Sequence, residues 1–123
     1  MPSTLKVLLG SALCCLPLLV NAAEQPAKPA TDQEASVDEG LKKFGYLSGL
    51  ALGCVDDKQT EKLEREVMDV NAELTRLLGS DSAFLYSAAF GYGSNIELKA
   101  QECKEVLERY EARYQSFLKG AKS

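Results

Sequence analysis

Two long stretches of the chain carry apolar residues with the alternating four- and three-residue spacing of an amphipathic helix. The first stripe consists of Leu63, Val67, Val70, Leu74 and Leu77. The second consists of Ile96, Ala100, Cys103, Leu107, Tyr110, Tyr114 and Phe117. Residues at this spacing share one face of a helix, and the charged residues between them occupy the other faces. The pattern predicts one helix from Asp56 or Asp57 to Gly79 and another from about Asn95 to Lys119.

Two further helices follow from end signals. Ser36-x-x-Glu39 is a capping box, in which two side chains satisfy each other's unpaired backbone donors, and it predicts a helix from Ser36 to about Cys54. A short helix is expected from Ser82 to Phe90. Gly91-Tyr92-Gly93 should end it, and a second capping box, Ser94-x-x-Glu97, should open the last helix. No segment alternates with period two for the length of a strand, so we expect an all-α fold, a small up-down four-helix bundle with three long helices and one short.

The N-terminal residues 1–22 have the pattern of a secretion signal peptide. Lys6 precedes an apolar run of about 14 residues, and Ala22 is a small residue suited to cleavage before Ala23. The run is shorter than the roughly 20 residues of a membrane-spanning helix, so we expect no stable membrane anchor. Residues 23–35 contain two prolines and no large apolar residue, which predicts a flexible linker ahead of a helical domain at 36–120.

The cysteines support this interpretation. Cys14 and Cys15 would leave with the signal, so that Cys54 and Cys103 remain as the only pair in an oxidising compartment. In an up-down bundle the end of the first helix lies beside the start of the fourth, where these two residues are expected. We therefore predict a Cys54–Cys103 disulfide and a periplasmic or secreted location.

Charge and composition exclude several functions. Loss of Lys6 with the signal would change the formal net charge from −4 to −5, which disfavours nucleic acid and anionic membranes as partners. The chain contains no histidine, the commonest general base and metal ligand. Its carboxylates are accounted for as helix caps and solvated helix faces. The sequence predicts no catalytic residue, no metal ligand and no cofactor, and therefore a protein that is not an enzyme.

The segment from Phe44 to Val55 has no charged residue and contains a glycine at every fourth position. Each glycine inside a helix costs about 1 kcal/mol relative to alanine, so the repeat needs a reason. One interpretation is the close approach of a neighbouring helix; the other is a surface for self-association or for another protein. With the tyrosines of the short helix and its following loop, the candidate interaction surface comprises Gly45, Tyr46, Gly49, Gly53, Tyr86 and Tyr92.

These observations favour a non-enzymatic protein that acts by binding another protein or a second copy of itself. Small periplasmic inhibitors and the immunity proteins of type VI secretion resemble it in architecture, although no motif assigns the chain to either group. One alternative is an acid- or stress-responsive periplasmic chaperone. Another is a helical bundle that holds a small apolar molecule between its helices, lined by Tyr46, Tyr110 and Tyr114.

Overall fold

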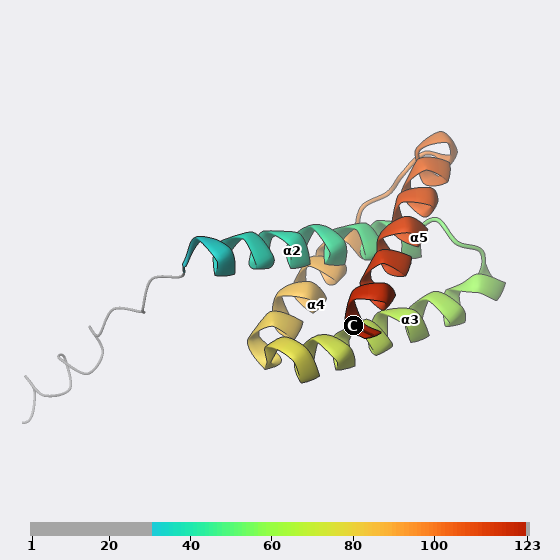
Figure 1. Ribbon diagram of the computed structural model, residues 1–123. Coiled ribbons are helices and arrows are strands. Elements are labelled where there is room, and N and C mark those ends of the chain that lie inside the picture. Colours follow the sequence, from blue (N-terminus) through green and yellow to red (C-terminus); the bar gives the residue numbers. More distant parts are fainter. Residues whose placement is uncertain (1–30, 123) are drawn as a thin grey trace, which may run out of the picture. The chain divides into compact units, whose positions relative to one another are not determined.

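The computed structural model describes residues 31–122, and this part of the chain folds into four helices. They are α2 (Asp32–Leu52), α3 (Asp57–Leu78), α4 (Ser80–Ser94) and α5 (Ala100–Lys122). Consecutive helices reverse direction (Figure 1), and α4 is the short one. The predicted all-α bundle of three long helices and one short is confirmed. The signal peptide expected at 1–22 and the first residues of the expected linker lie outside the described residues.

The first helix begins earlier than predicted. Thr31 caps it: the hydroxyl accepts a hydrogen bond from the Glu34 backbone at 3.2 Å, and the Glu34 carboxylate accepts one from the Thr31 backbone at 3.4 Å. The capping box is therefore Thr31-x-x-Glu34, and the predicted box at Ser36 and Glu39 lies inside the helix. Residues 32–35, assigned above to the linker, form the first turn. They lack glycine and proline, and the acidic Asp32 and Glu34 interact favourably with the positive, N-terminal end of the helix dipole.

The ends of α3 are where the sequence places them. Asp56 is the N-cap and accepts a hydrogen bond from the Gln59 backbone at 2.9 Å. Gly79 ends the helix with a φ of 97°, a conformation that favours glycine, and α4 begins at the next residue. Most of the predicted stripe is buried, namely Leu63, Val67, Val70 and Leu74. Leu77, the last residue of the predicted stripe, is not buried: it lies next to the end of the helix, and 46% of its surface is exposed.

The predicted break at Gly91-Tyr92-Gly93 is wrong. These residues continue α4 as far as Ser94, and α5 begins at Ala100 instead of Asn95. The Ser94 hydroxyl does not cap a following helix; it donates a hydrogen bond to the Gly91 carbonyl at 2.8 Å. Gly93 is buried, and a Cβ there would lie 3.2 Å from the Cα of Gly49 and closer still to the Tyr46 carbonyl. Packing against α2 therefore outweighs the low helix propensity of glycine.

Helix α2 forms the centre of the bundle. It packs most extensively against α4 and also contacts α5 and α3, while α3 packs against α4. Phe44 and Tyr86 meet edge to face in the core, with ring centroids 5.2 Å apart. The Tyr86 hydroxyl donates to Ser48 at 3.1 Å, and Ser48 donates to the Phe44 carbonyl at 2.8 Å. Both buried hydroxyl groups are thus satisfied, and they join α2 to α4.

The glycine repeat of α2 is explained in part by this contact. A Cβ at Gly45 would lie 3.0 Å from the Ala89 Cβ, and one at Gly49 would lie 2.6 Å from the Ser94 backbone nitrogen. Both would come closer still to a backbone carbonyl of α4. Gly53 differs: it is exposed, and its nearest neighbour would be 3.5 Å away. Two of the three glycines therefore let the backbones of α2 and α4 approach each other.

The Cys54–Cys103 disulfide is confirmed. It joins the segment after α2 to the first turn of α5, with Cα atoms 5.3 Å apart. Only Val106 and Tyr110 of α5 are buried, so the crosslink holds a helix that packs less deeply than α2 does.

Candidate interaction surfaces

The outer side of α4 presents apolar side chains to solvent. The helix has one charged residue, Asp81, at its first turn. Phe84, Ala88 and Tyr92 follow one another at intervals of four residues and are all exposed, with 70% of Phe84 and 68% of Tyr92 accessible. Residues at this spacing share one helix face. A helix that is apolar on all sides is normally buried on all sides, and α4 is not.

Two neighbouring side chains border this stripe. The ring of Tyr46, on α2, lies 5.8 Å from that of Tyr92 and is itself 37% exposed. Met68, on α3, is 69% exposed. It lies three residues before Asn71, whose amide donates to the Ser87 hydroxyl and to the Ala83 carbonyl, so Met68 is on the side of α3 next to α4. We call Tyr46, Met68, Phe84, Ala88 and Tyr92 the α4 face.

The structure divides the interaction surface predicted from the sequence. Tyr46 and Tyr92 lie on the α4 face and contact each other. Gly45, Gly49 and Tyr86 are buried in the contact between α2 and α4, and Gly53 is exposed beyond the end of α2. Sequence reasoning missed Phe84 and Met68. Phe84 could have been found from its eight-residue separation from Tyr92, but the expected end of the helix at Phe90 placed the two residues in different elements.

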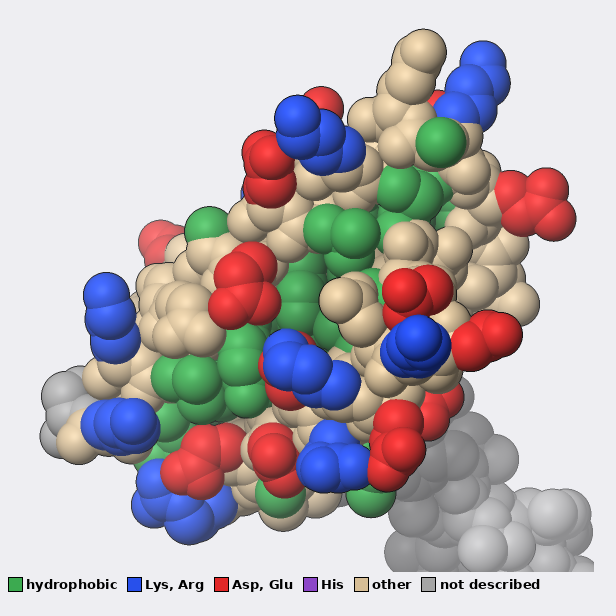
Figure 2. Space-filling view, turned by 90° about the vertical axis from the view of Figure 1, so that its right-hand side faces the viewer, with side chains coloured by type: hydrophobic (Ala, Val, Ile, Leu, Met, Phe, Trp, Pro, Cys, Tyr) green, Lys and Arg blue, Asp and Glu red, His purple; other side chains and the backbone are tan. Residues whose placement is uncertain are grey.

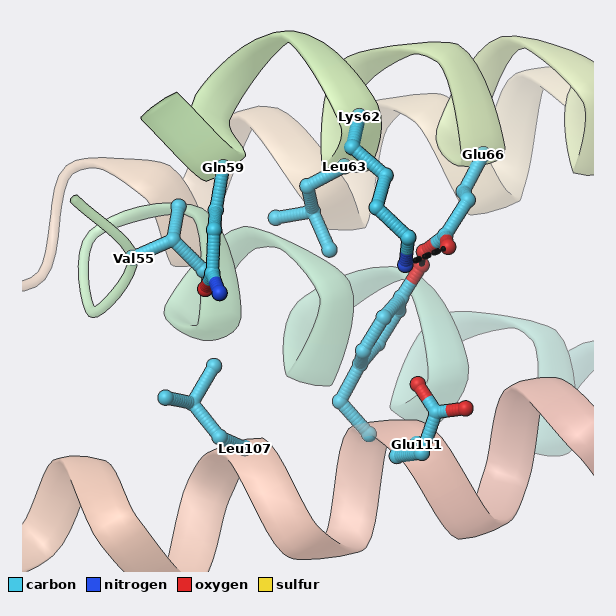
Figure 3. Close-up of a pocket in the computed structure, with 8 residues that line it drawn as sticks. Val55, Gln59, Lys62, Leu63, Glu66, Leu107 and Glu111 are labelled. Atoms are coloured by element: carbon cyan, nitrogen blue, oxygen red, sulfur yellow. Dashed lines mark hydrogen bonds and ion pairs between the residues drawn. The ribbon is translucent and has the colours of Figure 1, made fainter. Parts of the chain in front are cut away.

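A second candidate is a groove between α3 and α5, with α2 behind it (Figure 3). The face that carries the starts of α3 and α5 shows a band of hydrophobic side chains bordered by acidic and basic ones (Figure 2). Leu63 and Leu107 face each other across the pocket (Figure 3). Tyr110, on α5, also lines it and bonds to α3. The Tyr110 hydroxyl donates to the Glu66 carboxylate at 2.9 Å, and Lys62 forms an ion pair with Glu66 at 2.5 Å.

Glu66, one of the two carboxylates that line this groove, is engaged by both Lys62 and Tyr110. The hydrogen bond with Glu66 raises the pKa of Lys62, and burial raises the pKa of Tyr110, with Glu66 adding to the effect. Burial and the nearby Glu66, Asp69 and Glu111 also raise the pKa of Tyr114, although Lys62 opposes them. Glu66 thus holds a charged lysine and a neutral phenol. This arrangement ties α5 to α3.

The geometry does not gather the tyrosines expected around an apolar ligand. Tyr110 lines a pocket of about 240 Å³, below the roughly 300–1,000 Å³ of typical small-molecule sites. Tyr114 stacks on Tyr110 with ring centroids 5.9 Å apart but lines a different hollow, next to Phe117. Tyr46 lies with Tyr92 on the α4 face. The three tyrosines therefore do not enclose a common cavity.

Further features bear on the remaining classes of site. Within residues 31–122, none of the helices combines the length and apolar character needed to cross a bilayer. In the same part of the chain, no three or more histidine, cysteine or acidic side chains are grouped so that they could hold a metal ion. No protein-family model, curated protein or solved structure matches the sequence.

Proposed function

We propose that this chain is an exported, non-enzymatic protein that binds another protein through the α4 face. The observation that carries the proposal is the character of α4. This helix has a single charged residue and leaves two aromatic rings about 70% exposed. A soluble domain rarely exposes contiguous apolar side chains unless they meet a partner.

The residue types of the α4 face support a protein partner. Tyrosine, phenylalanine and methionine are enriched at the centres of protein interfaces, where charged residues are depleted. A tyrosine ring supplies contact area at a low cost in conformational entropy. The contact between Tyr46 and Tyr92 further restricts both rings before a partner arrives. Less conformational entropy is then lost on binding.

Affinity capture tests the proposal. The wild-type protein, tagged at its C-terminus and recovered from the exported fraction, should retain a partner that Phe84→Asp fails to retain. Gln101→Asp is the matched control, because it adds the same charge at an exposed site on α5 away from the α4 face. Loss of the partner in both variants, or in neither, would contradict a role for the α4 face.

Export is a separate part of the proposal and has its own test. The signal-like segment at 1–22 and the Cys54–Cys103 disulfide, a crosslink typical of oxidising compartments, both support it. Mass spectrometry of the protein from cells should find Ala23 at the N-terminus and both thiols oxidised. A chain that keeps residues 1–22 in a reducing compartment would contradict export without bearing on the α4 face.

An acid-responsive chaperone is the second candidate, and the Lys62–Glu66–Tyr110 contact favours it. Weakening of this contact in acid would loosen a link between α3 and α5. Apolar side chains between these helices would then become accessible to unfolded clients. An aggregation assay with a model client, run from about pH 4 to about pH 2 so that it passes below the usual carboxylate pKa, decides the matter. No suppression of aggregation there would eliminate this candidate.

A further inference from the structure

We infer that the partner on the α4 face is a second copy of this chain, bound with its α4 antiparallel to the first and with Ala88 at the two-fold axis. This inference rests on the proposed function, because it names the partner of the same surface. It draws on three observations: the distribution of charge, the order of residues along α4, and the extent of the exposed patch.

The charge distribution favours a like partner. The chain is acidic, with 18 Asp and Glu against 14 Lys and Arg, so most pairs of surfaces from two copies would bring like charges together. The five residues of the α4 face carry no charge, and Asp81 is the single charged side chain of α4. Two copies can therefore meet there without bringing carboxylates together if their α4 helices run antiparallel, whereas a basic partner would be attracted more strongly by the acidic parts of the molecule.

The order of residues along α4 suits a two-fold axis. A symmetric interface needs each residue to meet a complementary one when the helix is reversed. With the axis at Ala88, Phe84 of one copy faces Tyr92 of the other, an aromatic pair on each side of a small residue. Asp81 then faces Asn95, whose amide donates to the Gly91 carbonyl at 2.9 Å and has a second hydrogen to offer. A parallel arrangement would instead bring Asp81 against its own counterpart.

The size of the patch sets the expected affinity. A fully buried aromatic side chain covers about 150–250 Å². Two rings about 70% exposed therefore contribute roughly 200–350 Å² per copy, and Met68 and Tyr46 add to this. A standard interface buries about 800 Å² per partner, so this one belongs to the small, reversible class. We expect a dimer with a dissociation constant of about 1–100 µM.

The first experiment measures mass. Analytical ultracentrifugation of the processed protein, with its disulfide intact, should show a rise from one chain to two between about 1 and 200 µM. Phe84→Asp should weaken the dimer at least tenfold while circular dichroism shows the same helix content. Gln101→Asp should leave the dimer unchanged. This control shows whether the effect depends on where the negative charge is added or only on the added charge itself.

The second experiment tests the axis directly. Two packed helices have helix axes about 8–10 Å apart, and each Cα lies about 2.3 Å from its own helix axis. The two copies of residue 88, which face each other at the two-fold axis, can therefore have Cα atoms within the roughly 4.4–6.8 Å that a disulfide requires. Ala88→Cys should form a covalent dimer under mild oxidation. Ala112→Cys, the same change at an exposed alanine on α5, should not. A single-chain mass at every concentration, or equal crosslinking of the two variants, overturns the inference. If a different protein is still captured through Phe84, the proposed function stands and only the identity of the partner is wrong.

Discussion

Adding one methyl group at Gly49 tests the packing on which the fold depends. A Cβ at this position would lie 2.6 Å from the Ser94 backbone nitrogen, 2.8 Å from the Gly93 carbonyl carbon, and closer still to the Phe90 carbonyl oxygen. All three atoms belong to the backbone of α4, so no side chain can rotate out of the way. Gly49→Ala therefore forces α4 as a whole to move away from α2.

The expected cost follows from two opposing effects. Overpacking a close-packed contact typically costs about 1–3 kcal/mol, and the backbone obstruction at Gly49 places it near the upper limit. Alanine in place of glycine also stabilises the helix itself by about 1 kcal/mol. The net loss should be about 2 kcal/mol, and more where the shift of α4 also disturbs Tyr86. For a domain of this size, this loss lowers the unfolding temperature by about 8–16 °C.

Gly40→Ala is the matched control, because Gly40 lies in the same helix and a Cβ there would have no neighbour within 4 Å. It gains helix propensity without obstruction and should stabilise the protein by up to about 1 kcal/mol. Thermal unfolding of both variants, followed by circular dichroism with the disulfide intact, compares the two positions. If Gly49→Ala unfolded at or above the temperature of Gly40→Ala, the close approach of α2 and α4 would be wrong.

Three further predictions concern the disulfide, the buried phenol and the link from α5 to α3. Replacing Cys54 and Cys103 together by serine should lower the free energy of unfolding by about 4 kcal/mol in urea titrations, because the crosslink joins residues 49 apart; unchanged stability would contradict this. Burial raises the pKa of Tyr86 to about 12, above its value of about 10 in the unfolded chain. The folded state is therefore favoured by the neutral phenol below about pH 10, and about 2–3 kcal/mol of the free energy of unfolding is lost as the pH rises through 12. Unfolding measurements across this range should show that loss in the wild type and a smaller one in Tyr86→Phe. Tyr110→Phe should cost about 1–2 kcal/mol in the wild type and less in a Glu66→Gln background, whereas equal costs would mean that the two side chains are not coupled.

The parts of the fold that could be predicted from the sequence are those with local causes. The stripe on α3 stands in a segment rich in charged residues, so its period is unambiguous, and Asp56 and Gly79 mark its ends by their own chemistry. The disulfide could be predicted because only two cysteines remain beyond the signal-like segment. The start of α2 lies earlier than the sequence predicts, because Thr31-x-x-Glu34 and Ser36-x-x-Glu39 are equally good capping boxes and no local rule ranks them.

The end of α4 shows where local rules fail. Glycines at 91 and 93 are a strong signal for a turn in an isolated sequence. In the folded protein Gly93 lies against Tyr46 and Gly49, and a side chain there would separate the helices. The same residue type that weakens the helix locally is thus required by its neighbour. Such a requirement depends on residues more than forty positions away, which no periodicity within α4 reveals.

The exposure of α4 was beyond the reach of sequence reasoning for a related reason. An apolar helix shows no contrast between its faces, so its composition indicates burial without saying against what. Within the described residues, α4 packs on α2 and α3, and α5 packs on α2, where Phe44 contacts both Tyr86 of α4 and Phe117 of α5. Among residues 31–122, no other helix covers Phe84 and Tyr92, which stay about 70% exposed. The composition of α4 indicates burial on all sides, yet the packing of the described helices on one another leaves Phe84 and Tyr92 exposed. That outcome depends on the placement of the other helices, which no pattern within α4 reveals.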